Sequence, residues 1–238
     1  MRARCARPIS PTTRANDETS RAIAAGRAPG RSQAGPHPLG GSTDVPIGRG
    51  VPLSRFEVTD TPLLGLKLVR RQRLGDSRGF LSRLFCADEL AAAGWSQPIA
   101  QINHTFTARQ GTVRGMHYQR PPHAEVKLVS CVRGEVWDVA VDVREGSPTY
   151  LRWHAERLSA DNGQALLIPR GFAHGFQALT DDVELLYCHS AAHAAHAESG
   201  LNPVDERLNI RWPLPIAELS ARDTAHPPIT DTFQGVAT

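Results

Sequence analysis

Residues 135–144 read EVWDVAVDVR, a run in which apolar and polar side chains alternate. From residue 137 onward, every second side chain is apolar: Trp137, Val139, Val141 and Val143. The alternate positions contain Asp138, Asp142 and Arg144. Because successive side chains of an extended chain point to opposite faces, this period of two predicts a strand with one face in an apolar core. Arg-Gly at 133–134 and Gly-Ser-Pro at 146–148 are turn signals that bound the strand.

Similar short strands, separated by turn residues, are predicted along the chain from about residue 55 onward. They fall at 64–69, 80–85, 99–106, 126–132, 150–158, 165–169 and 183–188. One short helix is predicted at 87–93, and Gly94 directly after it is a normal C-terminal stop. The sequence contains no internal repeat. About ten strands at regular spacing predict an all-β sandwich or barrel with a few short helices.

Residues 1–50 differ in composition from the rest of the chain. They contain 13 Gly or Pro residues and no Phe, Trp or Tyr. Such a segment buries too little apolar surface to offset its chain entropy, so we expect residues 1–52 to form a disordered, Arg/Pro/Gly-rich tail. It lacks the apolar stretch of a secretory signal, and either a transit peptide or an over-extended translation start fits its composition. The folded domain is expected at residues 53–238, beginning near the first aromatic residue, Phe56.

Charge and hydropathy exclude several classes of protein. Residues 1–50 hold eight Arg and three acidic residues, a net charge of +5, so the formal net charge of +3 leaves −2 for the remainder. This distribution argues against a nucleic-acid-binding face on the folded domain. No apolar run approaches the roughly 20 residues needed to span a membrane. The four cysteines form no CxxC pair, so we expect free thiols and a cytoplasmic protein.

Three segments gather reactive side chains in short, strand-like stretches. They read RGMHYQ at 114–119, PRGFAHGF at 169–176 and LSARD at 219–223. If the first is a strand, His117 shares a face with Gly115 and Gln119. A single histidine on a strand is more often a structural hydrogen-bonding residue than a catalyst, so the pattern alone leaves both interpretations of His117 open.

The order of the motifs along the chain resembles that of a known family. The segments are DSRGF at 76–80, QINH at 101–104, RGMHYQ at 114–119, KLV at 127–129, GSPT at 146–149, GFAHGF at 171–176 and WP at 212–213. Together they resemble the dTDP-4-dehydrorhamnose 3,5-epimerase family over about residues 55–235, and an ordered set of this size is a specific signal. The resemblance implies a cupin-like jelly-roll β-barrel, a homodimer, a nucleotide-sugar substrate and no cofactor.

The residues also bear on whether the barrel holds a metal. A metal-binding cupin offers His-x-His plus Glu in its first motif, whereas this chain has HYQ at 117–119. With His174 in the second motif, only two scattered imidazoles remain, fewer than the three or so protein ligands of a catalytic metal. Three further histidines have the spacing of one helix face and are interpreted as solvated or loop residues, with a metal site as the less favoured alternative: His189, His193 and His196. We therefore expect no metal.

Removal of a proton beside a ketone requires a base, a donor or cation at the ketone oxygen, and an acid on the opposite face. The resemblance implies four catalytic residues: His117 as base, Asp223 orienting its imidazole, Lys127 near the developing oxyanion and Tyr187 as proton donor. Each has a structural alternative, namely a hydrogen-bonding histidine, a turn cap, a surface cation and a barrel-lining aromatic. These alternatives are weakened because all four residues fall at matching positions.

A nucleoside diphosphate needs guanidinium or amide donors. The resemblance places seven residues at substrate-binding positions: Arg78, Gln101, Asn103, Arg114, His174, Glu198 and Arg222. Arg222 stands where the family has a lysine, and an exposed arginine without a ligand is the ordinary alternative for Arg78 and Arg222. Other departures are Arg83 for a glutamate, Ile102 for an aspartate and His193 for a tyrosine. The catalytic set is therefore intact, while the recognition set is altered.

The function implied is epimerisation at C3, and also at C5, of a dTDP-4-keto-6-deoxyhexose for deoxysugar and polysaccharide biosynthesis of the dTDP-L-rhamnose type. One alternative is an epimerase of C3 or C5 alone that acts on another nucleotide sugar. A non-catalytic nucleotide-sugar-binding cupin is a second alternative, against which the intact catalytic set argues. A metal-dependent cupin oxygenase is a third, against which the missing His-x-His argues.

Overall fold

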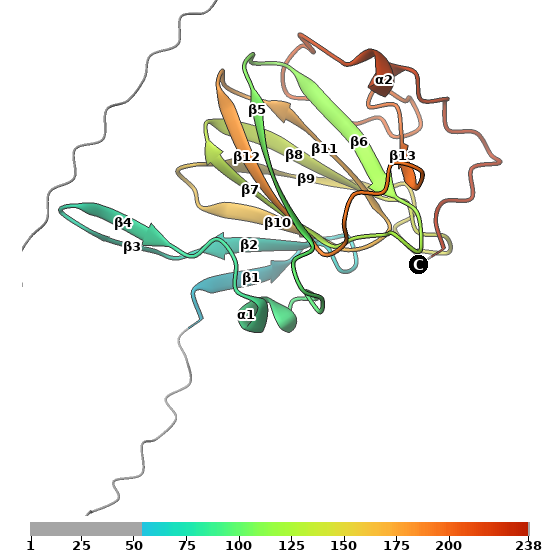
Figure 1. Cartoon of the computed structure of the whole chain (residues 1–238). Helices are drawn as coiled ribbons and strands as arrows, with labels where there is room; N and C mark the ends of the chain where they lie inside the picture. The colour runs from blue at the N-terminus through green and yellow to red at the C-terminus, as the bar shows by residue number, and fades with distance from the viewer. Residues whose placement is uncertain (1–53, 238) are drawn as a thin grey trace, which may run out of the picture. The chain divides into compact units, whose positions relative to one another are not determined.

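Two antiparallel sheets make up most of the structure, a computed structural model that describes residues 54–237 (Figure 1). The predicted tail at 1–52 lies outside the described residues. The six-stranded sheet has the order β1 (Phe56–Asp60), β2 (Lys67–Arg71), β10 (Gln164–Ile168), β7 (Lys127–Arg133), β12 (Val183–His189), β5 (Gln101–Thr107). The five-stranded sheet has the order β13 (Glu198–Gly200), β6 (Val113–Gln119), β11 (Phe172–Ala178), β8 (Glu135–Asp142), β9 (Trp153–Ser159).

The connectivity is that of a jelly roll. From β5 to β8, and again from β9 to β12, consecutive strands alternate between the two sheets. Helices are limited to α1 (Ala87–Ala91) and α2 (Ala221–Thr224) within the described range. The all-β, cupin-like barrel expected from the sequence is therefore confirmed. No helix of the described residues has both the length and the apolarity to cross a membrane.

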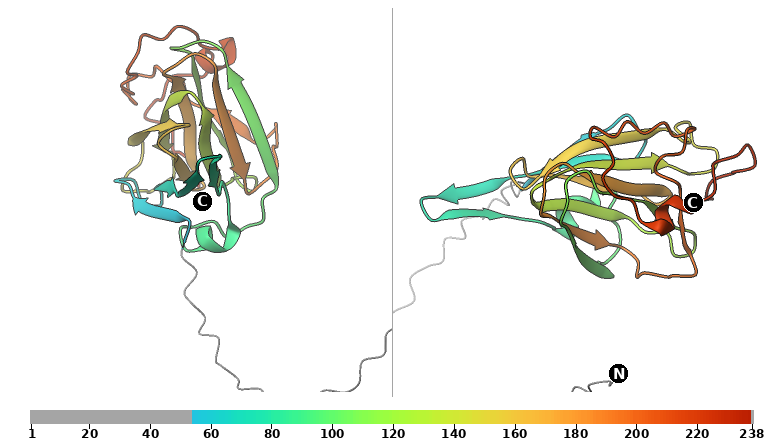
Figure 2. Two further views of the ribbon diagram at one scale, coloured as in Figure 1. Left: turned by 90° about the vertical axis from the view of Figure 1, so that its left-hand side faces the viewer. Right: turned by 90° about the horizontal axis from the view of Figure 1, so that it is seen from above.

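Apolar side chains fill three layers, one between the sheets and one on the outer face of each. The inner layer takes alternate residues of facing strands, such as Val129 and Leu185 from one sheet and Phe176 from the other. The segment around α1 covers the outer face of the six-stranded sheet through Leu90 and Trp95. The C-terminal segment covers the other outer face, as the red chain in Figure 2 shows. Central strands are therefore largely apolar on both faces, and their polar residues line the cavity or are buried with a partner.

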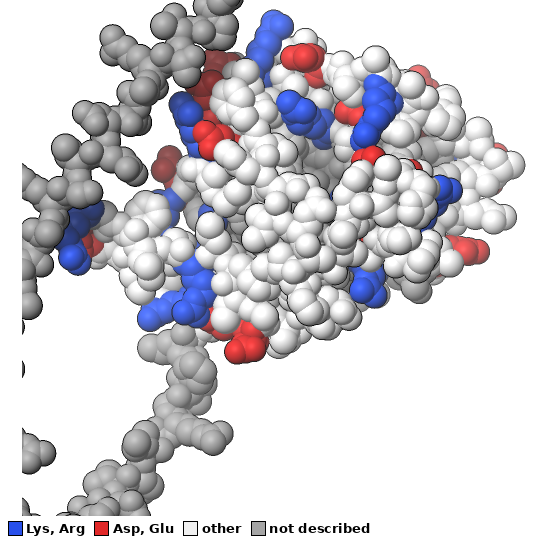
Figure 3. Space-filling view, viewed as in Figure 1, with Lys and Arg blue, Asp and Glu red and all other residues white. Residues whose placement is uncertain are grey.

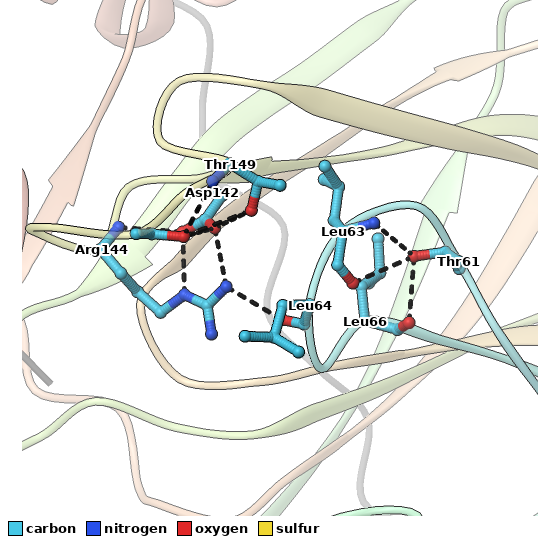
Figure 4. A network of polar contacts seen from close by, with 8 residues as sticks. Thr61, Leu63, Leu64, Leu66, Asp142, Arg144 and Thr149 are labelled. Atoms are coloured by element: carbon cyan, nitrogen blue, oxygen red, sulfur yellow. Dashed lines mark hydrogen bonds and ion pairs between the residues drawn. The ribbon is translucent and has the colours of Figure 1, made fainter.

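The apolar face predicted for β8 is buried, and its polar residues are buried as well. Asp138 and Asp142 are both 0% exposed. Burying a carboxylate is unfavourable unless it is paired, and each has a partner. Asp142 accepts hydrogen bonds from Arg144 Nε (2.8 Å), Ser147 Oγ (2.5 Å) and Thr149 Oγ1 (2.6 Å), while an Arg144 nitrogen also donates to the Leu64 carbonyl (Figure 4). Ser147 and Thr149 of the GSPT motif thus hold Asp142, and Arg144 links this turn to the loop before β2.

Three strands were not predicted from the sequence: β1, β13 and β3 (Arg73–Asp76), which pairs with β4 (Gly79–Ser82). The predicted strand at 80–85 ends earlier, at Ser82, and the predicted helix at 87–93 is the shorter α1. The β3–β4 hairpin stands out from the sheets in Figure 1 and in the right-hand view of Figure 2. Its pattern shows no apolar alternation because nearly all of its residues are exposed.

Candidate active site

A cavity of about 570 Å³ lies between the two sheets. Inward-facing side chains of β5, β6, β7, β11 and β12 line it, together with residues around β13 and α2. Ten of the eleven predicted site residues meet there: His117, Tyr187, Asp223, Lys127, Gln101, Asn103, Arg114, His174, Glu198 and Arg222. Arg78 is the exception. Residues spread over more than 120 positions of sequence are thus gathered into one polar pocket at the wall of an apolar barrel.

Two glycines set the close approach of β6 and β11 beside this pocket. A Cβ on Gly115 would lie 2.5 Å from the Cα of Gly175, and Gly115 has a φ of +122° that favours glycine. A Cβ on Gly175 would lie 2.7 Å from the carbonyl oxygen of Arg114. The strands therefore cross closely, and the register places His117 directly opposite His174. This geometry explains why each histidine motif carries a glycine.

His117 and Asp223 form a hydrogen-bonded dyad. The Nε2 atom of His117 lies 2.7 Å from Oδ1 of Asp223, whose side chain is 4% exposed. The backbone N–H of Gly115 donates to the other carboxylate oxygen at 3.3 Å. Ser220, rather than Asp223, caps the helix α2, because its Oγ accepts from the backbone N–H of Asp223. The Asp223 carboxylate is therefore free to face the imidazole, and the turn-cap alternative is not supported.

The two groups of the dyad titrate below their ordinary values. Burial lowers the pKa of His117, although the hydrogen bond and charge of Asp223 oppose this effect. Burial by itself would raise the pKa of Asp223, but hydrogen bonds from His117 and Gly115 keep the net shift downward. Near neutral pH the pair is therefore a neutral imidazole beside a carboxylate. Since Nε2 donates to Asp223, Nδ1 carries the free lone pair of the base.

Tyr187 enters the cavity from β12, in the sheet opposite His117. Burial and then the charge of Asp138 raise the pKa of its phenol, which therefore stays protonated. Its ring meets the His174 ring edge-on, with centroids 5.8 Å apart. His174 is held by Asp138, whose carboxylate oxygens lie 2.9 and 3.0 Å from its Nε2. A second histidine–aspartate pair thus packs against the phenol.

Lys127 lies in the cavity wall on β7 and is buried rather than on the surface. Its Nζ lies 3.0 Å from Glu125 Oε1 and donates to the carbonyl of His117 at 3.3 Å. The surface-cation alternative for Lys127 is therefore wrong. A buried ammonium inside a cavity is suited to stabilise negative charge that develops on a bound molecule.

Polar groups for an anionic or hydroxylated ligand ring the mouth of the cavity. Arg222 forms a two-pronged ion pair with Glu198, at 2.8 and 3.3 Å. Arg114 on β6 donates to Thr107 Oγ1 at 3.0 Å. Gln101 donates to Asn103 at 2.9 Å and accepts from the backbone N–H of the residue at 193. These contacts hold the predicted recognition residues in defined orientations around one opening.

Arg78 lies away from these residues, at the turn of the β3–β4 hairpin. Its side chain is 87% exposed and pairs only with the neighbouring Asp76 among the described residues. Within one copy of the chain it does not reach the cavity. The altered position Arg83 pairs with Glu89 of α1 and also lies outside it. On the face drawn in Figure 3, basic and acidic side chains are interspersed rather than gathered into a basic patch.

Some cavity residues were missed by the sequence analysis. Glu125 and Gln119 lie behind Lys127, and His189 stacks on Tyr187 at 6.0 Å between ring centroids. The solvated interpretation of His189 is wrong, whereas His193 and His196 lie in an exposed loop, as one of the two interpretations held. The period of β12 could have indicated His189, because it shares the parity of Tyr187.

One group of three side chains among the described residues brings potential metal ligands within 4.8 Å of one another: His117, Asp223 and His226. Two of these groups, His117 and Asp223, are already hydrogen-bonded to each other. A metal at this place would therefore compete with the dyad.

Comparisons with known proteins identify the family of this chain. The family model described as dTDP-4-dehydrorhamnose 3,5-epimerase matches residues 60–231. The chain is 43% identical over 169 residues to the dTDP-4-dehydrorhamnose 3,5-epimerase of Shigella flexneri, covering 71% of this chain and 93% of that one. It is 38% identical over 160 residues to the dTDP-4-dehydrorhamnose 3-epimerase of Streptomyces niveus, covering 67% and 77%.

A solved structure supports the same assignment. It is the dTDP-6-deoxy-D-glucose-3,5-epimerase of Legionella pneumophila in complex with dTDP-4-keto-L-rhamnose. The two structures superpose with a TM-score of 0.72 and 33% identity, over 77% of this chain and 98% of the other. Fold, gathered site and sequence similarity agree: this chain belongs to the dTDP-4-dehydrorhamnose 3,5-epimerase family.

Proposed function

We propose that this enzyme epimerises C3 and C5 of a dTDP-4-keto-6-deoxyhexose, in the supply of a dTDP-L-rhamnose-type deoxysugar. The observation that carries the proposal is the His117–Asp223 dyad, which faces Tyr187 and Lys127 across one cavity. The family relationship supports the reaction, and the roles of the individual residues rest on the geometry.

The geometry suits proton abstraction beside a ketone. Nδ1 of His117 takes the proton from the carbon, and the bonding electrons move to the ketone oxygen to give an enolate. The N–H of Lys127 stabilises that oxygen, while Asp223 stabilises the imidazolium that forms. The phenol of Tyr187 returns a proton to carbon and is itself reprotonated from solvent, as the imidazolium is deprotonated by solvent.

Inversion requires that the proton leave one face of the carbon and return to the other. His117 comes from β6 in the five-stranded sheet, whereas Tyr187 comes from β12 in the six-stranded sheet. A sugar held between the sheets therefore meets base and acid from opposite sides. A pair of groups on one sheet would return the proton to the face it left, which gives exchange without inversion.

A C3-only epimerase is the second candidate function. His193 replaces a family tyrosine, and its side chain is exposed at the mouth of the cavity. The similarity to a 3-epimerase is compatible with this reading. The two candidates differ only in whether C5 exchanges its proton.

We propose that the enzyme works as a homodimer in which the β3–β4 hairpin packs against a second copy. Phe80 and Leu81 on this hairpin are 61% and 69% exposed, which is costly unless a partner covers them. On the edge strand β5, Ile102 and Phe106 are 60% and 49% exposed. This arrangement would also give Arg78 a role, because it would carry the guanidinium toward the cavity of the other copy.

We further propose metal-independent catalysis in the cytoplasm. Gln119, at the position of the second metal-binding histidine, has its amide engaged by Glu125 and by the backbone of Ala194. The cysteines of the described part are free, which fits a reducing compartment.

Deuterium uptake from D₂O into dTDP-4-keto-6-deoxyglucose, followed by NMR, tests the function. Uptake at C3 and C5 with formation of the inverted product is the expected result. Uptake at C3 alone would support the monoepimerase. If a folded, metal-free enzyme gave no uptake at either carbon, the proposed reaction would be wrong for this substrate.

A further inference from the structure

A line of buried polar contacts runs behind the catalytic lysine. Glu125 is 7% exposed, and its Oε1 lies 3.0 Å from Lys127 Nζ. Its Oε2 accepts a hydrogen bond of 2.8 Å from Nε2 of Gln119. The Oε1 of Gln119 in turn accepts from the backbone N–H of Ala194 at 2.6 Å, and its Nε2 also donates to the carbonyl of His123 at 2.9 Å. Backbone groups thus hold the amide of Gln119, and this amide holds the carboxylate of Glu125. The carboxylate in turn pairs with the ammonium of Lys127.

A carboxylate at this place needs an explanation. The cavity has to accept a diphosphate and stabilise an enolate, and a buried negative charge opposes both. If Glu125 served only to fill space, an uncharged residue of similar size could take its place. Both of its oxygens are instead engaged, one by Gln119 and one by Lys127.

The contacts define the direction of the ammonium group. Lys127 Nζ has three N–H donors. One is directed to Glu125 and one to the carbonyl of His117, at 3.3 Å. No other described residue accepts from it, so the third donor is left for a ligand in the cavity. A lysine side chain has four rotatable bonds, so without these two contacts the ammonium would not be confined to one position.

We propose that Glu125, held by Gln119, is a positioning residue that keeps Lys127 charged and directed at the ketone oxygen during enolate formation. This inference rests on the proposed function for its role in the reaction, but the charge and position of Lys127 can be measured without turnover. Gln119 of the HYQ motif stands at the position where a metal cupin has a ligand. In this chain it supports Lys127 through Glu125.

Lys127 has titratable neighbours on several strands around the cavity. Lys127 pairs with His189 on β12 and with the apolar Ile168 on β10. Burial, and then the charge of Lys127, lowers the pKa of His189 to about 4. The pKa of His117 is lowered mainly by burial, and that of Tyr187 is raised mainly by burial.

The sequence offers an unusually clean measurement, because it contains only two lysines, Lys67 and Lys127. Lysine labelled with ¹³C at Cε gives two NMR signals, and Lys67 serves as the internal reference. In Glu125→Gln, we expect the titration midpoint of the Lys127 signal to move to lower pH by at least about one unit, because a buried ammonium without its counter-charge loses its proton more easily. The Lys67 signal should not move. An unmoved Lys127 midpoint would overturn the proposal, whether or not the enzyme turns over this substrate.

Kinetics provide the second test, with Glu57→Gln on exposed β1 as the matched control. In Glu125→Gln, kcat should fall roughly 10- to 100-fold with KM within about threefold, since a donor to the oxyanion is misplaced. The alkaline limb of activity should move to lower pH. In a Lys127→Met background, Glu125→Gln should cost less than about twofold, because the residue acts through the lysine. Equal losses in both backgrounds would assign Glu125 a structural role instead. Absence of exchange in the wild type, with the NMR shift present, would refute the proposed function and leave the positioning intact.

Discussion

Replacement of Asp223 by Asn removes the carboxylate from the dyad with little change of shape. In the resting enzyme the imidazole of His117 is neutral, but proton abstraction converts it to an imidazolium 2.7 Å from a side chain that is 4% exposed. Hydrogen bonds to charged groups contribute about 1.5–3 kcal/mol. Since each 1.36 kcal/mol changes a rate tenfold, kcat/KM should fall roughly 10- to 150-fold in Asp223→Asn.

The pH profile of the same variant has a predicted sign. The base must be unprotonated, so activity is lost as pH falls through the pKa of His117. Asp223 raises that pKa, against the larger lowering by burial. Its removal should therefore move the acid limb of kcat/KM to lower pH.

The assay is loss of the C3 proton of the substrate in D₂O, measured by NMR between pH 4.5 and 8. The matched control is Asp231→Asn, a 96% exposed carboxylate paired with Arg207, which should retain the wild-type profile. If kcat/KM in Asp223→Asn stayed within twofold of wild type and the acid limb did not move, the carboxylate would not act on His117 during catalysis.

Three further predictions concern the strand crossing, the acid and the hairpin. Gly115→Ala should lower the free energy of unfolding by at least about 2 kcal/mol, because its Cβ would lie 2.5 Å from Gly175 Cα. The control Gly146→Ala, with φ +71° but no atom within 4 Å, should lower the free energy of unfolding by about 1 kcal/mol. Equal costs in denaturant titrations would contradict the close-approach argument. Tyr187→Phe should retain C3 exchange in D₂O, but its rate of inverted-product formation should fall at least about 100-fold. The control Tyr150→Phe loses a 2.6 Å hydrogen bond outside the cavity and should keep both rates. A parallel loss of exchange in Tyr187→Phe would show that Tyr187 is not the acid. Leu81→Asp should convert a dimer to a monomer by light scattering, whereas Leu64→Asp, at a similarly exposed position outside the hairpin, should not; a monomeric wild type would exclude the homodimer.

Much of the barrel could be predicted from the sequence because its strands obey simple periodicity. The strands β5, β7, β9, β10 and β12 lie close to their predicted ranges. The missed strand β3 and its hairpin partner β4 lack a pattern because they are exposed, whereas β11 and most of β8 are buried on both faces, where an additional layer of chain covers polar residues. Asp138 and Asp142 therefore look like solvent-facing residues in the pattern, although each is buried with a partner.

The site could be predicted where ordered motifs marked it, and not where contacts depend on three-dimensional proximity. His117 and Asp223 are 106 positions apart, and only the motifs connected them before the structure brought them together. Glu125 carries no sequence signal, because a charged residue before a strand is ordinarily solvated. Arg78 matches its motif but lies on an exposed hairpin outside the cavity, and only the proposed homodimer would bring it to a substrate site.

The most direct test of the central claim compares wild type with His117→Ala in D₂O, at equal concentrations and with dTDP binding measured in parallel. We predict deuterium uptake at C3 by the wild type, at least about 100-fold slower uptake by His117→Ala, and retained binding of dTDP by both. Uptake by His117→Ala near the wild-type rate would contradict the account, because the base would then have to be a different group.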